Sequence, residues 1–253
     1  MYNLTFISET DFRKHVAQTL KSYDNSLKSI DLMTFNSNII DPIKLLFDKS
    51  AFQKSFDEII DLEIHRQRDK SNNNAIGYFH QNIFKYIQNC IVPTEGWDVI
   101  VTLPKYKIYV EMKNKHNTMN SSSSQKTYIQ MQNQILTNPN DYCYLVETIA
   151  PVSRNIAWGC SVNKKHCSNE HIRRVSMDKF YAIVTGIEDA FYQMCLQLPI
   201  TIDELILEGQ IGTIQSDTVL EELHRKNPDT LKAMYLLAFE TYEGFDKLLV
   251  SKE

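Results

Sequence analysis

The sequence predicts an α/β domain of the mixed α+β kind, with a central mixed β-sheet flanked by helices. Two observations support this fold class. Apolar residues recur at helical spacing in the N-terminal third and again after about residue 176. Between these parts, runs rich in β-branched and aromatic residues alternate with turn signals. Helices therefore precede and follow a group of strands, which is typical of a sheet that helices cover.

The elements follow one another in a definite order. We expect the polar stretch 66–74 to interrupt the N-terminal helical pattern. Residues 104–107 are a turn candidate, which makes the strands on either side antiparallel neighbours if the turn is tight. The expected helices cover 9–35, 40–66, 76–90, 125–136, 178–185, 188–198 and 220–249, and the expected strands cover 97–103, 108–113, 142–149 and 155–162.

The composition argues against a membrane protein. Hydrophobic residues make up 43% of the chain and charged residues 23%, as in ordinary soluble globular proteins. No apolar run approaches the ~20 residues that span a bilayer. The N-terminal sequence lacks a basic region followed by an apolar stretch. We therefore expect no secretion signal and a cytoplasmic protein.

The five cysteines contain no C-x-x-C pair, and in a reducing compartment we expect them to be small buried apolar residues. A zinc site is an alternative. Two of its four candidate ligands are adjacent and point in different directions, and no paired spacing recurs, so a solvated loop is the simpler interpretation. The candidate ligands are Cys160, His166, Cys167 and His171.

The charges are unevenly distributed along a chain whose net charge is −4. Residues 101–175 carry 10 basic and 4 acidic side chains, whereas residues 176–253 carry 6 and 14. A basic segment between acidic flanks can form a surface that attracts phosphate, which the net charge conceals. A solvated charged face explains the pattern equally well, so charge alone leaves both interpretations open.

Two acids and a lysine occupy the expected strand pair. Asp98 lies near the start of an apolar strand, and Glu111 and Lys113 close the next one. Residues two apart on a strand project from the same face. If the strands pair through the turn, Asp98 and Glu111 lie near the same end of the hairpin. Their carboxylates can then share a divalent cation, with Lys113 beside them.

These residue types suit phosphodiester hydrolysis. Mg²⁺ prefers hard oxygen ligands, so Asp98, Glu111 and the main-chain carbonyl of Met112 are the candidate metal ligands. The cation can polarise a phosphate and acidify a bound water. Lys113 can orient or deprotonate that water and offset negative charge. Alone, an acid-x-Lys sequence at a strand end is a weak signal, because solvated strand ends often carry it.

The surrounding residues make the interpretation more specific. The runs 96–101 and 109–121 resemble type II restriction endonucleases of the PD-(D/E)XK superfamily, most closely the subgroup that cuts GGNCC. The stretch 74–84 is similar to the helix before the catalytic hairpin of that subgroup. The resemblance is dense over 74–130 and thinner over 142–185. It implies a restriction-endonuclease-like core.

Carried over position by position, the resemblance implies metal-binding acids at Asp98 and Glu111 and the family's lysine at Lys113. Many relatives also have a glutamate in the preceding helix as an extra metal ligand. This chain has His80 and Gln81 there instead, which leaves open whether one or two ions bind and what these two residues do.

We expect a single restriction-endonuclease-like domain over residues 1–253. It would consist of an N-terminal helical part (1–73), a catalytic core (74–200) and a C-terminal helical part (201–253). The basic segment 154–174 is where we expect residues that read bases, because arginine and lysine bind the O6 and N7 atoms of guanine.

The resemblance implies a homodimer that acts on double-stranded DNA with Mg²⁺, and a cognate DNA methyltransferase as genetic partner. A near-palindromic site is matched by two-fold protein symmetry. Two alternatives remain. The chain could be a repair or mobile-element nuclease of the same superfamily, or a catalytically silent DNA-binding protein in which the Glu-x-Lys sequence is incidental.

Overall fold

The structure is a computed structural model that describes residues 2–116, 118–209, 212, 215–241 and 248. The chain forms two compact units, each built from two separate stretches. The first, which we call the sheet unit, comprises residues 1–20 and 75–210. The second, the helical unit, comprises residues 21–74 and 211–253. Whether the chain works as the expected single domain stays a prediction.

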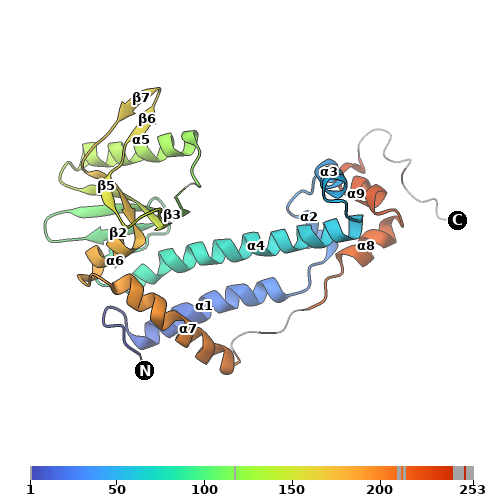
Figure 1. The fold of residues 1–253 in the computed structure, drawn as a ribbon, viewed down its shortest axis with the longest axis horizontal. Coiled ribbons are helices and arrows are strands. Elements are labelled where there is room, and N and C mark those ends of the chain that lie inside the picture. The colour runs from blue at the N-terminus through green and yellow to red at the C-terminus, as the bar shows by residue number, and fades with distance from the viewer. Residues whose placement is uncertain (1, 117, 210–211, 213–214, 242–247, 249–253) are drawn as a thin grey trace. The chain divides into compact units, whose positions relative to one another are not determined.

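A six-stranded mixed sheet forms the centre of the sheet unit (Figure 1). Its strand order is β1-β2-β3-β4-β8-β5. Strands β1, β2 and β3 are antiparallel, β3, β4 and β8 are parallel, and β5 is antiparallel to β8 at the edge. The bounds are β1 Cys90–Ile91, β2 Val99–Thr102, β3 Lys107–Lys115, β4 Tyr142–Ile149, β5 Asn155–Ala157 and β8 Ile172–Ser176. The predicted mixed sheet flanked by helices is confirmed.

Helices cover both faces of this sheet. Successive side chains of a strand point to opposite faces, and in these strands both sets are largely apolar. On one face, Val110 of β3 and Val146 of β4 belong to a large core that includes Phe180 of helix α6 and Met194 of helix α7. On the other, Leu145 packs with buried residues of helix α5. The bounds are α5 Ser121–Thr137, α6 Met177–Thr185 and α7 Ala190–Leu207, and Figure 1 shows α5 and α6 on opposite sides of the strands.

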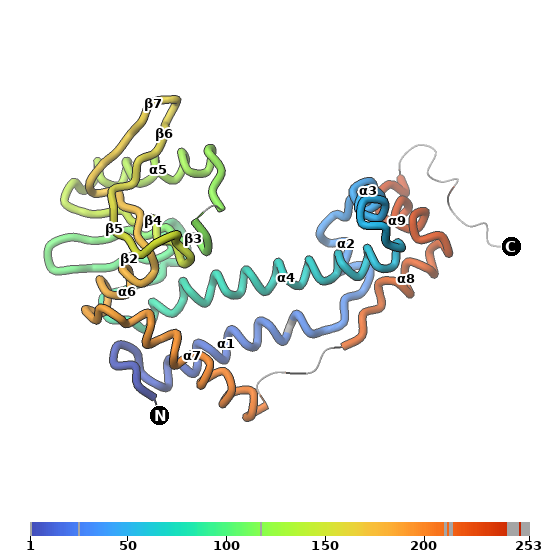
Figure 2. Tube along the Cα trace, viewed as in Figure 1, coloured from blue at the N-terminus to red at the C-terminus, as the bar shows by residue number. Residues whose placement is uncertain are grey.

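The remaining two strands, β6 Cys160–Val162 and β7 Lys165–Cys167, form a separate two-stranded ladder (Figure 2). Sequence reasoning expected one strand over 155–162, but the chain leaves the main sheet after Ala157. At Gly159 a Cβ atom would lie 2.6 Å from the ring of His166, so glycine allows this close approach. One predicted strand therefore becomes two, β5 and β6.

The helical unit has its own core, in which Phe35, Ile60 and Leu223 are completely buried. Aspartates begin three of its helices by accepting main-chain N–H bonds: Asp31 before α2, Asp41 before α3 and Asp229 before α9. The helices that contribute to this unit are α1 Glu9–Leu27, α2 Leu32–Asn36, α3 Pro42–Phe52, α4 Phe56–Asn82, α8 Val219–Lys226 and α9 Thr230–Phe239. The parts of α1 before residue 21 and of α4 after residue 74 belong to the sheet unit.

The expectation that the polar stretch 66–74 breaks the helical pattern is wrong. Helix α4 runs through it without interruption, followed by a short 3-10 helix at Ile83–Tyr86. The polar side chains find partners. Gln67 donates to the main-chain carbonyl of Phe35, and Arg68 forms an ion pair with Asp217. Sequence periodicity cannot reveal such partners, because they lie far away along the chain.

Other boundaries also differ from expectation. The helix expected over 9–35 ends at Leu27, and a new one begins after the cap Asp31. The helix expected over 40–66 is divided at Gln53, whose φ of 53° is left-handed. The helix expected over 125–136 begins four residues earlier, so the serine run 121–124 forms the first turn of α5. The helix expected over 188–198 extends to Leu207. The single helix expected over 220–249 is divided into α8 and α9, and α9 ends at Phe239. Residues 242–247 of that expected helix lie outside the described residues.

Candidate active site

Asp98 lies directly before β2, at the end of the β2–β3 hairpin. Its main-chain N–H donates to the carbonyl of Val110 at 2.9 Å. Its carboxylate oxygen Oδ2 accepts a hydrogen bond from the N–H of Met112 at 2.7 Å. Because Val99 pairs with Val110, Asp98 lies opposite Glu111. The expected convergence of Asp98 and Glu111 at one end of an antiparallel hairpin is therefore confirmed.

Burial raises the pKa of the Asp98 carboxyl above its ordinary value. The Met112 N–H acts in the opposite direction by stabilising the charged form, while the nearby Glu111 raises the pKa further and Lys113 lowers it. The net shift is upward. A half-buried carboxylate of this kind gains from an additional positive charge, which a bound cation would supply.

Glu111 and Lys113 share one face of β3, the face that α5 covers. The preceding residues Ile108 and Val110 are buried in the core on the other side, and the intervening Met112 packs against that core. Lys113 Nζ lies 2.7 Å from Glu111 Oε1, and the two side chains remain 30% and 21% exposed. The ammonium and the carboxylate therefore form an ion pair that solvent or a ligand can reach.

The oxygen ligands present fit a magnesium ion. Mg²⁺ usually keeps several waters and needs only one or two carboxylates from the protein. Asp98 and Glu111 supply two on neighbouring strands, and among the described residues no group of three or more His, Cys, Asp or Glu side chains could hold a metal. A strand residue directs its N–H and C=O towards the same neighbour. Since the Met112 N–H binds Asp98, its carbonyl also faces that side of the strand.

His80 and Gln81, near the end of α4, differ in their surroundings. Gln81 donates from Nε2 to the main-chain oxygen of Asp98 at 3.2 Å and thus supports the strand that carries the acid. The Nδ1 atom of His80 is buried without a hydrogen-bond partner among the described residues. Burial, together with the nearby His15, lowers the pKa of His80 to about 4. His80 is therefore neutral at physiological pH.

Sequence reasoning missed a fourth charged residue on this face, Glu147 of β4. Its side chain is only 1% exposed. Arg154 and Arg174 each donate to it at 2.6 Å, and His116 Nδ1 lies 2.9 Å from its Oε1 atom. Glu147 directly follows the apolar run 142–146 within an otherwise buried strand, just as Asp98 interrupts its own apolar strand. That interruption was the available signal.

The basic side chains of segment 154–174 do not form one continuous surface. Arg154 and Arg174 converge on Glu147. Arg173, the neighbour of Arg174 on β8, points elsewhere and binds Asn155 and Glu170. Alternation along a strand places adjacent side chains on opposite faces. The structure thus separates arginines that the sequence groups together.

The candidate zinc ligands are distributed around the small ladder. Cys160 and Cys167 are opposite each other in the β6–β7 pair. His171 instead stacks on Tyr142 and binds the main-chain oxygen of Asp141 through Nδ1 at 2.9 Å. His166 packs against Gly159. Cys160 and Cys167 are therefore neighbours, whereas His171 is held elsewhere by Asp141 and Tyr142.

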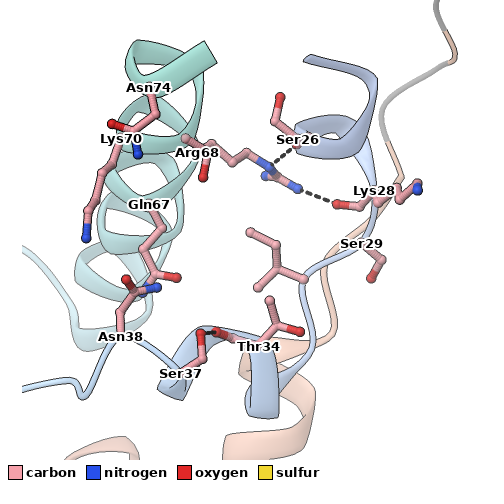
Figure 3. Close-up of a pocket in the computed structure, with 12 residues that line it drawn as sticks. Ser26, Lys28, Ser29, Thr34, Ser37, Asn38, Gln67, Arg68, Lys70 and Asn74 are labelled. Atoms are coloured by element: carbon pink, nitrogen blue, oxygen red, sulfur yellow. Dashed lines mark hydrogen bonds between the residues drawn. The ribbon is translucent and has the colours of Figure 1, made fainter. Parts of the chain in front are cut away.

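A separate polar pocket lies in the helical unit (Figure 3). Arg68 crosses it and donates to the main-chain oxygens of Ser26 and Lys28 at 2.7 and 3.1 Å. The same guanidinium is bound by Asp217. Its donors therefore connect the segments around the pocket. None of the candidate acids or Lys113 lines it.

The mixed sheet with helices on both faces is a restriction-endonuclease-like fold. Comparisons with known proteins show that the chain belongs to the class of restriction endonucleases. Residues 4–207 match the family model described as Eco47II restriction endonuclease. The type II restriction enzyme Sau96I of Staphylococcus aureus is 31% identical over 211 residues, which cover 80% of this chain and 81% of that protein. The type II restriction enzyme Eco47II of Escherichia coli is 31% identical over 221 residues, which cover 83% of this chain and 91% of that protein.

The chain therefore belongs to the Eco47II restriction endonuclease family. The predicted relationship to type II restriction endonucleases is confirmed. Within the described part of the chain, no helix is long and apolar enough to cross a membrane.

Proposed function

We propose that the protein is a type II site-specific deoxyribonuclease. It hydrolyses phosphodiester bonds of duplex DNA at a short near-palindromic site in a Mg²⁺-dependent reaction, and GGNCC is the first site to test. The observation that carries this proposal is the position of Asp98 opposite Glu111, with Lys113 bound to Glu111 at 2.7 Å. Membership of a restriction endonuclease family supports it.

Asp98, Glu111 and the main-chain carbonyl of Met112 would hold the cation. When bound, Mg²⁺ supplies charge neutralisation at the scissile phosphate and makes a water more acidic. The half-buried Asp98 is held for this role by the Met112 N–H at 2.7 Å and by Gln81, which binds its main-chain oxygen. The protein thus orders the ligands before DNA arrives, which reduces the cost of reorganisation during the reaction.

Lys113 is the residue that acts on the attacking water. Its ammonium is 30% exposed and is held on the same face as Glu111. From there it would donate a hydrogen bond to the attacking water and orient it. The positive charge also offsets the negative charge that develops on the phosphate during attack. The water oxygen forms the new bond to phosphorus and gives up a proton to bulk water, while the bond to the leaving sugar oxygen breaks and that oxygen takes up a proton from bulk water.

The biological setting follows from the same proposal. Two copies of the chain would form a homodimer, so that each copy cuts one strand of the symmetric site. A cognate DNA methyltransferase would protect the host DNA, and both enzymes would act in the cytoplasm.

A digest tests the proposal. Purified protein is incubated with unmethylated plasmid and Mg²⁺, and the fragment ends are sequenced. Discrete fragments with one common end sequence are expected. A smear or structure-dependent nicking would indicate a repair or mobile-element nuclease instead.

Variants link cleavage to the site. Glu111→Ala should lower the cleavage rate by orders of magnitude while DNA binding persists. Glu170→Ala is the matched control, because Glu170 is 82% exposed and, within the described part of the chain, forms an ion pair with Arg173 alone. Equal cleavage by wild-type protein and Glu111→Ala would reject the proposed active site. The Glu-x-Lys sequence would then be incidental.

A further inference from the structure

The charged group around Glu147 consists of Glu147, Arg154, Arg174 and His116, and we call it the Glu147 cluster. Arg154 Nη2 and Arg174 Nε each lie 2.6 Å from a carboxylate oxygen of Glu147. His116 Nδ1 lies 2.9 Å from both Glu147 and Arg154. The guanidinium of Arg174 also lies over the ring of Trp158. These contacts hold both arginines in fixed positions.

The cluster is adjacent to the candidate active site. In the parallel pair of β3 and β4, Lys113 is the register partner of Glu147. Both side chains project from the face that α5 covers, since Leu145, two residues before Glu147, packs there. Neighbouring strands lie about 4.8 Å apart. A DNA backbone that reaches Lys113 therefore passes close to the cluster.

The charges within the cluster do not balance. One carboxylate faces two guanidinium groups, so the cluster carries a net positive charge even when His116 is neutral. Arg154 and Arg174 remain 16% and 21% exposed. The Nε atom of Arg154 is buried and has no hydrogen-bond partner among the described residues. An anionic ligand at the exposed part of these guanidinium groups would offset the unbalanced positive charge.

We infer that Glu147 holds Arg154 and Arg174 as a clamp for a backbone phosphate of the DNA, next to the phosphate that is cut. This inference rests on the proposed nuclease function. Arginine presents a planar fork that binds phosphate oxygens with two parallel bonds, and Glu147 fixes the orientation of that fork. The two arginines thus position the strand and carry no sequence information, in contrast to the expected reading of bases by this segment.

The salt dependence of DNA binding tests the clamp. Binding of the full-length protein to a mixed-sequence duplex is measured by fluorescence anisotropy in EDTA at a series of KCl concentrations. Each lost phosphate contact reduces the slope of log K against log salt concentration by about 0.9. Arg154→Gln and Arg174→Gln should each show this reduction and weaker binding at low salt.

Arg173→Gln is the matched control, because Arg173 lies on the same strand, is similarly exposed and binds Asn155 and Glu170. Its slope should equal that of the wild-type protein. Glu147→Gln keeps both arginines, so its slope should not fall, whereas its cleavage rate should fall because the arginines lose their orientation. Circular dichroism verifies the fold of each variant.

A second measurement uses only the wild-type protein. Once the cut position is mapped, duplexes are prepared with a single neutral methylphosphonate at each position flanking the cut. One position next to the cut should weaken binding several-fold. Wild-type slopes in folded Arg154→Gln and Arg174→Gln, or no sensitive phosphate beside the cut, would overturn the clamp. A wild-type protein that neither binds nor cuts DNA would instead overturn the proposed nuclease function.

Discussion

Asp98 lies opposite Glu111 across the β2–β3 pair, and its carboxylate accepts a hydrogen bond from the Met112 N–H at 2.7 Å. The acid is therefore held by the strand that carries its partner. This arrangement brings two negative charges together in a half-buried place, where burial and Glu111 raise the pKa of Asp98. Such a site is unfavourable for the isolated protein and suits a cation.

Asp98→Asn should separate stability from activity. The amide oxygen can still accept the Met112 N–H, and removal of the half-buried charge relieves the repulsion from Glu111. We expect unchanged or slightly higher thermal stability and a loss of cleavage of at least about a hundredfold, because a group that stabilises the transition state is removed. Thermal unfolding and plasmid cleavage measure the two effects. A variant that cuts at the wild-type rate would contradict the assigned role.

Magnesium binding should be visible without DNA. A ligand that binds only the folded state stabilises it by RT ln(1 + [L]/Kd), about 1.4 kcal/mol at about ten times Kd. We expect Mg²⁺ to raise the Tm of the wild-type protein and of Glu170→Gln, whereas Glu111→Gln should show a much smaller rise. Differential scanning fluorimetry with a Mg²⁺ titration checks this. An equal rise in all three proteins would place the ion elsewhere.

The neutral His80 should make the protein sensitive to acid. Burial lowers the pKa of His80 from 6.5 to about 4, so the folded state resists protonation that the unfolded state accepts. The free energy of unfolding therefore decreases as the pH falls below 6.5, and the loss grows until the pH reaches about 4. At pH 5 the loss from this group is about 1 to 2 kcal/mol relative to neutral pH.

His80→Leu should reduce this acid sensitivity. Urea unfolding at pH 7 and pH 5 measures the difference for wild-type protein and variant. The carboxyl groups titrate in both proteins, so the comparison isolates the contribution of His80. The same decrease in both proteins would show that His80 is not the acid-sensitive group.

Arg68 should be important for the stability of the helical unit. Its guanidinium binds Asp217 and the main-chain oxygens of Ser26 and Lys28. Arg68→Ala leaves these acceptors without this donor, and a charged hydrogen bond contributes about 1.5–3 kcal/mol. We expect a loss of stability of this order in urea unfolding. Lys70→Ala, at an exposed position of the same helix, is the control and should have little effect.

Much of the candidate site could be predicted from the sequence because its main contact is local. Glu111 lies thirteen positions after Asp98, and a hairpin with a turn at 104–107 is sufficient to bring them together. The alternation of side chains then places Glu111 and Lys113 on one face. The strand expected at 142–149 also matches β4, because the apolar run 142–146 follows the turn residues 138–140 and is broken only at Glu147 and Thr148.

Tertiary structure alone decided the partners of Glu147 and the continuity of α4. Arg174 reaches Glu147 from β8, and Asp217 reaches Arg68 from beyond α7, so neither contact has a signature in the local periodicity. The two compact units are also discontinuous in sequence, since residues 1–20 pack with 75–210. By itself, the sequence determined the residue types and the hairpin that align two acids and a lysine. Which distant charges neutralise one another depends on long-range packing, because burial makes an unpaired charge too costly to leave without a partner.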